Sequence, residues 1–193
     1  MYWADQIVEK LKERNLPLEW VDDMKTPSGF AHVGSLCGPL FNSVLYRCLT
    51  DLKVKTKFSF VINDFDPADE LPPECRESLK EYLGFPLRQV PSPEKNFDSL
   101  GSFLASDFIK TFRELGVEAE IFSSWDLYHQ GKFDEVIKMA LDNAEKIQEI
   151  YGRVSGSKKK EAGWLPFQVI CEKCGKLGTT KVYKWDKKLD GKN

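Results

Sequence analysis

Nine consecutive residues have the types and the order of a phosphate-binding turn. They are Pro27, Ser28, Gly29, Phe30, Ala31, His32, Val33, Gly34 and Ser35. A turn of this kind before a helix presents backbone N–H groups to an anion, and its glycines let the anion approach. His32 could donate to a phosphate oxygen and stabilise charge that develops on phosphorus, while Ser28 and Ser35 supply hydroxyl donors and Gly34 leaves room for a flat adenine ring. The alternative is a helix cap that contains a locally hydrogen-bonded histidine. The pattern is neither Gly-x-Gly-x-x-Gly nor Gly-x-x-x-x-Gly-Lys-Ser/Thr.

Two carboxylates, Asp64 and Asp66, lie one residue apart in the segment Asn63-Asp64-Phe65-Asp66. This segment directly follows a predicted strand, where side chains can face a ligand. The carboxylates could bind a substrate ammonium group or a magnesium ion. The alternative is a turn before Pro67 in which aspartate caps the backbone.

The two cysteines of Cys171-Glu172-Lys173-Cys174-Gly175-Lys176 have the spacing of a zinc knuckle. Zinc requires four ligands, and the 19 residues after Cys174 contain neither cysteine nor histidine. The pair is therefore predicted to be one half of a zinc site. An unmetallated remnant and a redox pair remain as alternatives. Nearby, Trp164-Leu165-Pro166-Phe167 could form an aromatic wall beside a ligand or pack locally.

Strands and helices alternate in the periodicity of the chain, which predicts an α/β fold with a Rossmann-like parallel sheet. The predicted strands are Leu18–Val21, Lys57–Ile62 and Val117–Phe122, and the predicted helices are Trp3–Arg14, Leu36–Leu52, Glu74–Leu83, Ser106–Leu115 and Phe133–Tyr151. The proline-rich segment Pro72–Leu100 is predicted to be an extended surface insertion. Because ligands of such sheets bind at the carboxyl ends of the strands, the Pro27–Ser35 and Asn63–Pro67 turns should face one crevice.

Composition excludes several classes of protein. With 193 residues, 41% of them hydrophobic, the chain can bury a core, and its net charge of -2 excludes a wholly basic nucleic-acid coat. Lys158-Lys159-Lys160 is a local basic patch or a solvated loop. No apolar run reaches membrane-spanning length, no secretory signal is visible, and the five cysteines lack a disulfide pattern. A cytoplasmic protein without a membrane partner is expected.

The order of these motifs along the chain resembles class I lysyl–tRNA synthetases, the kind typical of archaea. The motifs that carry the resemblance are Thr26-Pro27-Ser28-Gly29 with His32-Val33-Gly34-Ser35 (the HIGH signature of the class), Asp64-Phe65-Asp66-Pro67, Glu81-Tyr82-Leu83-Gly84-Phe85-Pro86-Leu87, and Trp164-Leu165-Pro166-Phe167 before the cysteine pair. The resemblance runs over nearly the whole chain. It implies a nucleotide-binding catalytic domain over residues 1–163 and the start of a zinc-binding insertion over residues 164–193.

The resemblance implies the activation of lysine by ATP and lysyl transfer to tRNA(Lys). His32 and Ser35 would be catalytic, and Pro27, Ser28, Gly29, His32, Val33, Gly34 and Ser35 would bind ATP. Thr26, Asp64 and Asp66 would bind the amino acid, and Cys171 and Cys174 would bind a metal. The expected cofactors are ATP as substrate, Mg²⁺, and Zn²⁺ at a half-site.

Departures from the family pattern keep other functions open. The second catalytic signature, the lysine-containing KMSKS loop, is absent from the 193 residues, so they are expected to be an incomplete part with little adenylation activity of their own. Met24 stands where the family usually has glycine, close to the amino-acid pocket. Ala68-Asp69-Glu70 replaces a typically basic stretch. The alternatives are a non-catalytic, synthetase-like binding or regulatory protein and another nucleotidyltransferase with a HIGH signature.

Overall fold

The computed structural model describes residues 2–156 and 161–186. The chain forms two compact units, Met1–Asp126 and Leu127–Asn193. This division is one of packing, and the boundary expected between residues 163 and 164, which separates two functional regions, stays a prediction. The lysine patch at residues 158–160 lies outside the described residues.

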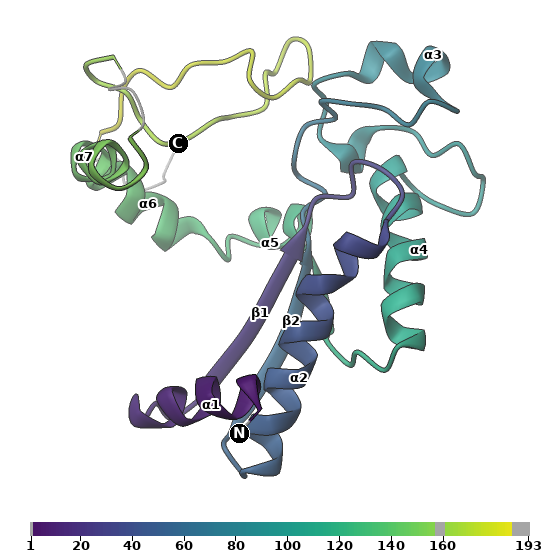
Figure 1. Ribbon diagram of the computed structural model, residues 1–193. Coiled ribbons are helices and arrows are strands. Elements are labelled where there is room, and N and C mark those ends of the chain that lie inside the picture. The colour runs from purple at the N-terminus through teal and green to yellow at the C-terminus, as the bar shows by residue number, and fades with distance from the viewer. Residues whose placement is uncertain (1, 157–160, 187–193) are drawn as a thin grey trace. The chain divides into compact units, whose positions relative to one another are not determined.

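A parallel three-stranded sheet organises the first unit (Figure 1). The strands β1 (Glu19–Lys25), β2 (Thr56–Ile62) and β3 (Glu120–Ser123) are arranged in the order β1-β2-β3. The helix α2 (Cys37–Asp51) connects β1 to β2, and the path from β2 to β3 includes α4 (Leu100–Glu114). Helical crossovers of this kind are what parallel neighbours require. The α/β fold with a Rossmann-like parallel sheet is therefore confirmed, and β1 extends four residues beyond the predicted strand end at Val21.

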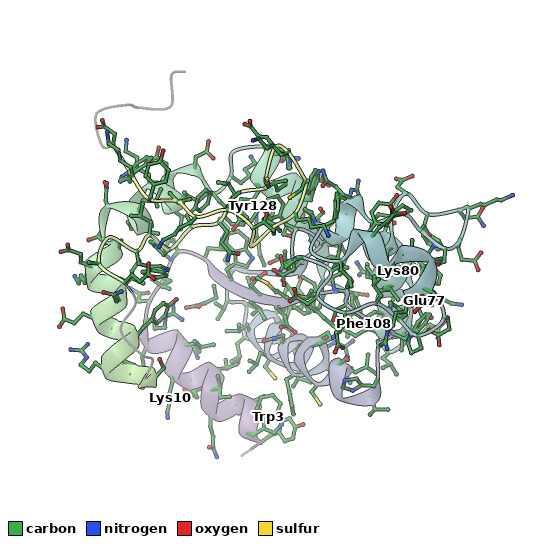
Figure 2. All side chains as sticks on the ribbon, turned by 90° about the horizontal axis from the view of Figure 1, so that it is seen from above. Trp3, Lys10, Glu77, Lys80, Phe108 and Tyr128 are labelled. Carbon is green, nitrogen blue, oxygen red and sulfur yellow. The ribbon has the colours of Figure 1, made fainter. Side chains whose placement is uncertain are left out.

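One face of the sheet carries the main hydrophobic core. Phe58, Phe60 and Ile62 of β2 alternate with outward-facing residues and pack against Phe108 and Phe112 of α4, the former labelled in Figure 2. The core also contains one fully buried residue from each of two other helices: Val8 of α1 (Trp3–Glu13) and Leu49 of α2. Both α2 and α4 thus cover the same face. Because the three strands are parallel, their carboxyl ends lie at one edge of the sheet.

The opposite face of the sheet leaves two large side chains of β1 exposed, Trp20 at 64% and Met24 at 55%. The indole N–H of Trp20 donates to Ser59 Oγ over 2.7 Å, and the Ser59 hydroxyl donates to Asp22. Met24 therefore lies near the carboxyl end of β1 on the face that the core does not cover.

The insertion between β2 and α4 has a small core of its own, so the prediction of an extended surface segment was wrong. Buried apolar residues from the whole segment form it: Ala68, Leu71, Cys75, Leu79, Leu87, Val90, Leu100 and Leu104. The predicted helix at Glu74–Leu83 is a turn of α-helix, α3 (Arg76–Leu79), continued by the 3-10 turn η2 (Lys80–Tyr82). Glu77 and Lys80 form an exposed ion pair there, with 3.4 Å between the charged atoms (Figure 2).

Two predicted helices have different bounds in the structure. Helix α4 begins at Leu100, not Ser106, because the Ser99 side chain accepts from the backbone N–H of Ser102 and forms a capping box with it. The long helix predicted from Phe133 to Tyr151 is two helices, α6 (Asp134–Asp142) and α7 (Ala144–Ser155). Their periodicity continues across Asn143, whose non-helical backbone and side-chain bond to the Met139 carbonyl separate them.

Residues 161–186 of the second unit form an irregular segment that runs out, turns and comes back (green to yellow in Figure 1). Its outgoing and returning arms lie side by side, since Glu161 pairs with Lys181 and the Thr180 hydroxyl donates to the Val169 carbonyl over 2.6 Å. The Cys171–Cys174 turn lies between the two arms. No helix among residues 2–156 and 161–186 is long and apolar enough to cross a bilayer.

Candidate functional site

The nine-residue turn joins the end of β1 to the start of α2. After Lys25 the chain makes the Pro-Ser-Gly turn, and a short 3-10 turn, η1 (Val33–Leu36), leads directly into α2. The backbone N–H of Ser35 donates to the His32 carbonyl over 2.8 Å, which closes the turn. The His32 side chain is exposed. The predicted phosphate-binding residues therefore form one continuous loop before a fifteen-residue helix.

Gly34 permits the observed position of the His32 ring. A Cβ atom built on Gly34 would lie 3.0 Å from both Cε1 and Nδ1 of His32, tighter than ordinary contact. Any larger residue at position 34 would therefore displace the imidazole. Ser35 is different, because its hydroxyl oxygen is buried and has no hydrogen-bond partner in the described part of the chain. An unpaired buried hydroxyl costs about 1–3 kcal/mol, so a phosphate oxygen that reached it would gain a strong donor.

Beneath the turn, side chains fill the space between the loop and α4. A cavity there has a volume of about 10 Å³ and is lined by Lys25, Pro27, Gly29, Ile62 of β2 and core residues of α4. The ammonium group of Lys25 lies 6.0 Å from the ring centre of Phe108. This space holds no more than one water molecule, so it has no room for a nucleotide.

Thr26 and Asp66 meet at the carboxyl edge of the sheet, as the shared crevice predicts. The hydroxyl of Thr26 donates to Asp66 Oδ2 over 2.6 Å, and Asn63 Nδ2 lies 3.4 Å from Thr26 Oγ1. The backbone N–H of Asn63 donates to the Lys25 carbonyl over 2.9 Å and joins the two strand ends. Asp66 is half-buried and retains free acceptor capacity on its carboxylate.

Asp64 has a different environment, because its side chain is buried and turned toward the end of β3. Its carboxylate accepts from the Ser123 hydroxyl at 2.8 and 2.9 Å and from the backbone N–H of Trp125 at 3.0 Å. These bonds hold the first turn of a helix that sequence periodicity did not predict, α5 (Ser124–His129). The structure thus separates the two carboxylates: Asp66 faces Thr26, and Asp64 connects β2 to β3.

Two charged residues near these strand ends were not predicted from the sequence. Arg88 lies on the 3-10 turn η3 (Leu87–Gln89), donates its backbone N–H to the Asp64 carbonyl and brings Nη1 to 4.0 Å from Asp64 Oδ2. Asp23, near the end of β1, lies against the first turn of α2, where a Cβ atom on Gly38 would be 2.2 Å from its Oδ2. A carboxylate is stabilised at a helix N-terminus. In the sequence, the only sign of a role for Asp23 was its position just before the turn.

The segment from Cys171 to Cys174 forms a turn that two backbone hydrogen bonds close, and the zinc half-site stays a prediction. The Gly175 N–H donates to the Cys171 carbonyl over 2.8 Å, and the Cys171 N–H donates to the Lys176 carbonyl over 3.0 Å. The pKa of the Cys174 thiol is lowered mainly by the Thr179 hydroxyl 3.5 Å away and, to a smaller extent, by the backbone N–H of Lys176. Within residues 2–156 and 161–186 no group of three or more metal-ligating side chains is present. Two thiols alone do not complete a tetrahedral zinc site.

Fold and site together define a class of protein. A parallel sheet with a glycine-containing turn between its first strand and the following helix, and with polar side chains at the ends of that strand and the next, is a Rossmann-like α/β arrangement, in which ligands bind at the carboxyl ends of the strands. Residues 1–190 match the family described as "tRNA synthetases class I (K)". The chain belongs to this family.

Curated relatives of the chain are named lysine–tRNA ligases. The chain is 36% identical over 187 residues to a lysine–tRNA ligase of Methanocaldococcus jannaschii. The aligned region covers 96% of this chain and 35% of the relative. It is 31% identical over 186 residues to that of Methanosarcina barkeri and 30% identical over 186 residues to that of Archaeoglobus fulgidus. The chain spans about a third of the length of these relatives.

Proposed function

We propose that the chain supplies the nucleotide-binding part of a lysine–tRNA ligase, which forms lysyl-adenylate from lysine and ATP and transfers the lysyl group to tRNA(Lys). The observation that supports this most strongly is the match of residues 1–190 to one synthetase family, together with the arrangement of the turn at residues 27–35. Transfer of an adenylyl group requires positioning and charge stabilisation, and no covalent enzyme intermediate.

The roles of the turn follow from its geometry. His32, whose ring is exposed above Gly34, would donate to the ATP phosphates as the lysine carboxylate attacks the α-phosphorus and pyrophosphate leaves. The hydroxyl of Ser35 would donate to the same phosphates. Pro27, Ser28, Gly29 and Val33 would hold the loop or contact the nucleotide through the backbone. Magnesium would arrive on the ATP phosphates, since the described residues hold no three-ligand cluster for it.

The amino acid would bind beside Thr26 and Asp66. The Asp66 carboxylate has acceptor capacity beyond its bond to Thr26, which suits an ammonium group. Asp64, initially expected to bind the amino acid, is better placed to position β3 and α5, because its carboxylate is buried among their donors. The Met24 side chain is exposed on the uncovered face of the sheet and would narrow any pocket there.

Binding of a non-hydrolysable lysyl-adenylate analogue tests this proposal without requiring turnover. Calorimetry should detect binding of lysyl-sulfamoyl adenosine to the chain, and His32→Ala and Asp66→Asn should each weaken it at least tenfold. His129→Ala and Asp69→Asn are matched controls, because they remove an exposed histidine and an exposed carboxylate outside the proposed site.

The amino-acid arm of the test discriminates between functions. A lysine-activating site should bind the lysyl analogue more tightly than the analogues of leucine and glutamate. Equal affinity for all three would favour a nucleotidyltransferase without an amino-acid pocket. No binding of any analogue would contradict the proposed function and favour a synthetase-like protein without catalysis.

A further inference from the structure

Three aromatic rings in sequence connect the turn at residues 27–35 to the start of α4 and to the insertion (Figure 1). Phe30 of the turn meets Phe103 edge to face, with ring centres 5.8 Å apart and an angle of 81° between the ring planes. Phe103 lies in the first turn of α4 and also meets Phe97 of the insertion, with ring centres 5.4 Å apart. Edge-to-face pairs stabilise a structure beyond the area that they bury, so these contacts hold the turn in a defined position.

The same end of α4 supports the turn from beneath. The space of about 10 Å³ between them is lined by residues of both, among them Pro27, Gly29, Leu104 and Ala105. Phe30 itself is 51% exposed, so burial accounts for only part of what its ring does. The directed contact with Phe103 is therefore what ties this part of the turn to the helix.

The insertion connects the start of α4 to the other half of the candidate site. The backbone N–H of Leu87 donates to the Asp66 carbonyl over 2.9 Å. The N–H of Leu100 donates to the Val90 carbonyl over 2.8 Å. Gly101 lies so close to Leu87 that a Cβ atom on it would be 3.2 Å from the Leu87 carbonyl oxygen. Through residues 87–90, the first turn of α4 is therefore held against the segment that carries Asp66.

We propose that the first turn of α4 sets the position of the nucleotide-binding turn relative to Asp66, and that Phe30 and Phe103 are positioning residues. This role rests on the proposed function, in which the two segments hold ATP and the amino acid. A turn that is already held in its binding position loses less freedom when the ligand arrives, so the ring pair strengthens binding without touching the ligand. His32 and Ser35 follow Phe30 in the same turn and are placed through it.

Binding of lysyl-sulfamoyl adenosine tests this role with substitutions that keep the side chains apolar. Phe30→Leu and Phe103→Leu should each weaken binding about 2- to 12-fold, which is the affinity equivalent of one aromatic pair. The double variant should bind no more weakly than either single variant, because both substitutions remove the same contact. Phe30→Tyr should bind as tightly as the unchanged chain, since it keeps an aromatic ring at a half-exposed position.

Phe41→Leu is the matched control for loss of an exposed aromatic pair. Phe41 lies on α2 outside the turn, is 56% exposed and meets Trp3 edge to face with ring centres 5.3 Å apart. This variant should bind the analogue as the unchanged chain does. Phe30→Leu should lower the melting temperature no more than Phe41→Leu, because both positions are half exposed. A comparison of Phe30→Leu with Phe30→Tyr decides the matter if Phe103→Leu does not fold.

Nuclear magnetic resonance of the ligand-free chain gives a second readout that does not depend on the proposed function. The chain contains two histidines, so two imidazole Cε1–H signals are expected, and His129→Ala assigns them. Phe30→Leu and Phe103→Leu should shift the His32 signal in the same direction, because each releases the turn from α4. Phe30→Tyr and Phe41→Leu should leave it in place. The His129 signal should stay unchanged in every variant that retains this residue.

Three results would overturn the positioning role: a His32 signal that neither leucine variant shifts, an equal loss of affinity in Phe41→Leu, or weaker binding in Phe30→Leu with normal binding in Phe103→Leu. The last would mean that Phe30 touches the ligand itself. If the unchanged chain binds no analogue but both leucine variants shift the His32 signal, the proposed function fails and the positioning of the turn stands. Analogue binding that neither leucine variant weakens would refute this inference alone.

Discussion

Replacing Asp64 by alanine should destabilise the first unit strongly, because it removes the acceptor that joins β2 to β3. Asp64 is 3% exposed. Its carboxylate accepts from the Ser123 hydroxyl at 2.8 and 2.9 Å and from the Trp125 N–H at 3.0 Å. Each hydrogen bond to a charged group contributes about 1.5–3 kcal/mol, and the donors left behind are partly buried. Since such bonds are not additive, we expect a loss of about 3–5 kcal/mol in the free energy of unfolding.

Urea denaturation measures this loss in free energy, thermal denaturation measures the melting temperature, and amide exchange shows where protection is lost. The melting temperature should fall by roughly 10–20 °C for a unit of this size, and the Trp125 amide should lose protection first. Asp66→Asn is the matched control, because that carboxylate accepts one described hydrogen bond, from Thr26, and is half-buried. It should cost about 1 kcal/mol or less. A loss below about 1 kcal/mol for Asp64→Ala, or equal losses for the two variants, would refute the assignment of Asp64 to architecture and Asp66 to ligand binding.

Two further predictions concern the loop and the knuckle. Gly34→Ala should displace the His32 ring, because the new Cβ would lie 3.0 Å from it. It should weaken binding of the lysyl-adenylate analogue at least tenfold and change the free energy of unfolding by less than about 1 kcal/mol. Unchanged binding of the analogue would contradict the steric argument. Thr179→Val should raise the pKa of Cys174, because it removes the hydroxyl that lowers this pKa most. The midpoint of the Cys174 alkylation rate against pH should therefore move upward. Cys75, whose pKa is raised mainly by burial and also by Glu74, should react slowly with and without the substitution. An unchanged midpoint would show that the hydroxyl does not stabilise the thiolate.

The sequence by itself determined the class of fold and the main loop. Alternating apolar patterns located β2 and α2 to within a residue or two, because both elements bury a continuous stripe against one core. The turn at residues 27–35 was recognisable because its chemistry is contiguous in the chain. Thr26 and Asp66 could be expected to meet, since carboxyl ends of parallel strands share an edge.

Only the tertiary structure decided which polar groups are used up within the fold. Asp64 and Asp66 look equivalent in sequence, yet the Ser123 hydroxyl and Trp125 N–H, about sixty residues further along the chain, bind one of them and leave the other beside Thr26. The break at Asn143 likewise depends on a local bond that periodicity does not record. Long-range hydrogen bonds carry no pattern in a single sequence, whereas apolar burial repeats with every turn of a helix and every second residue of a strand.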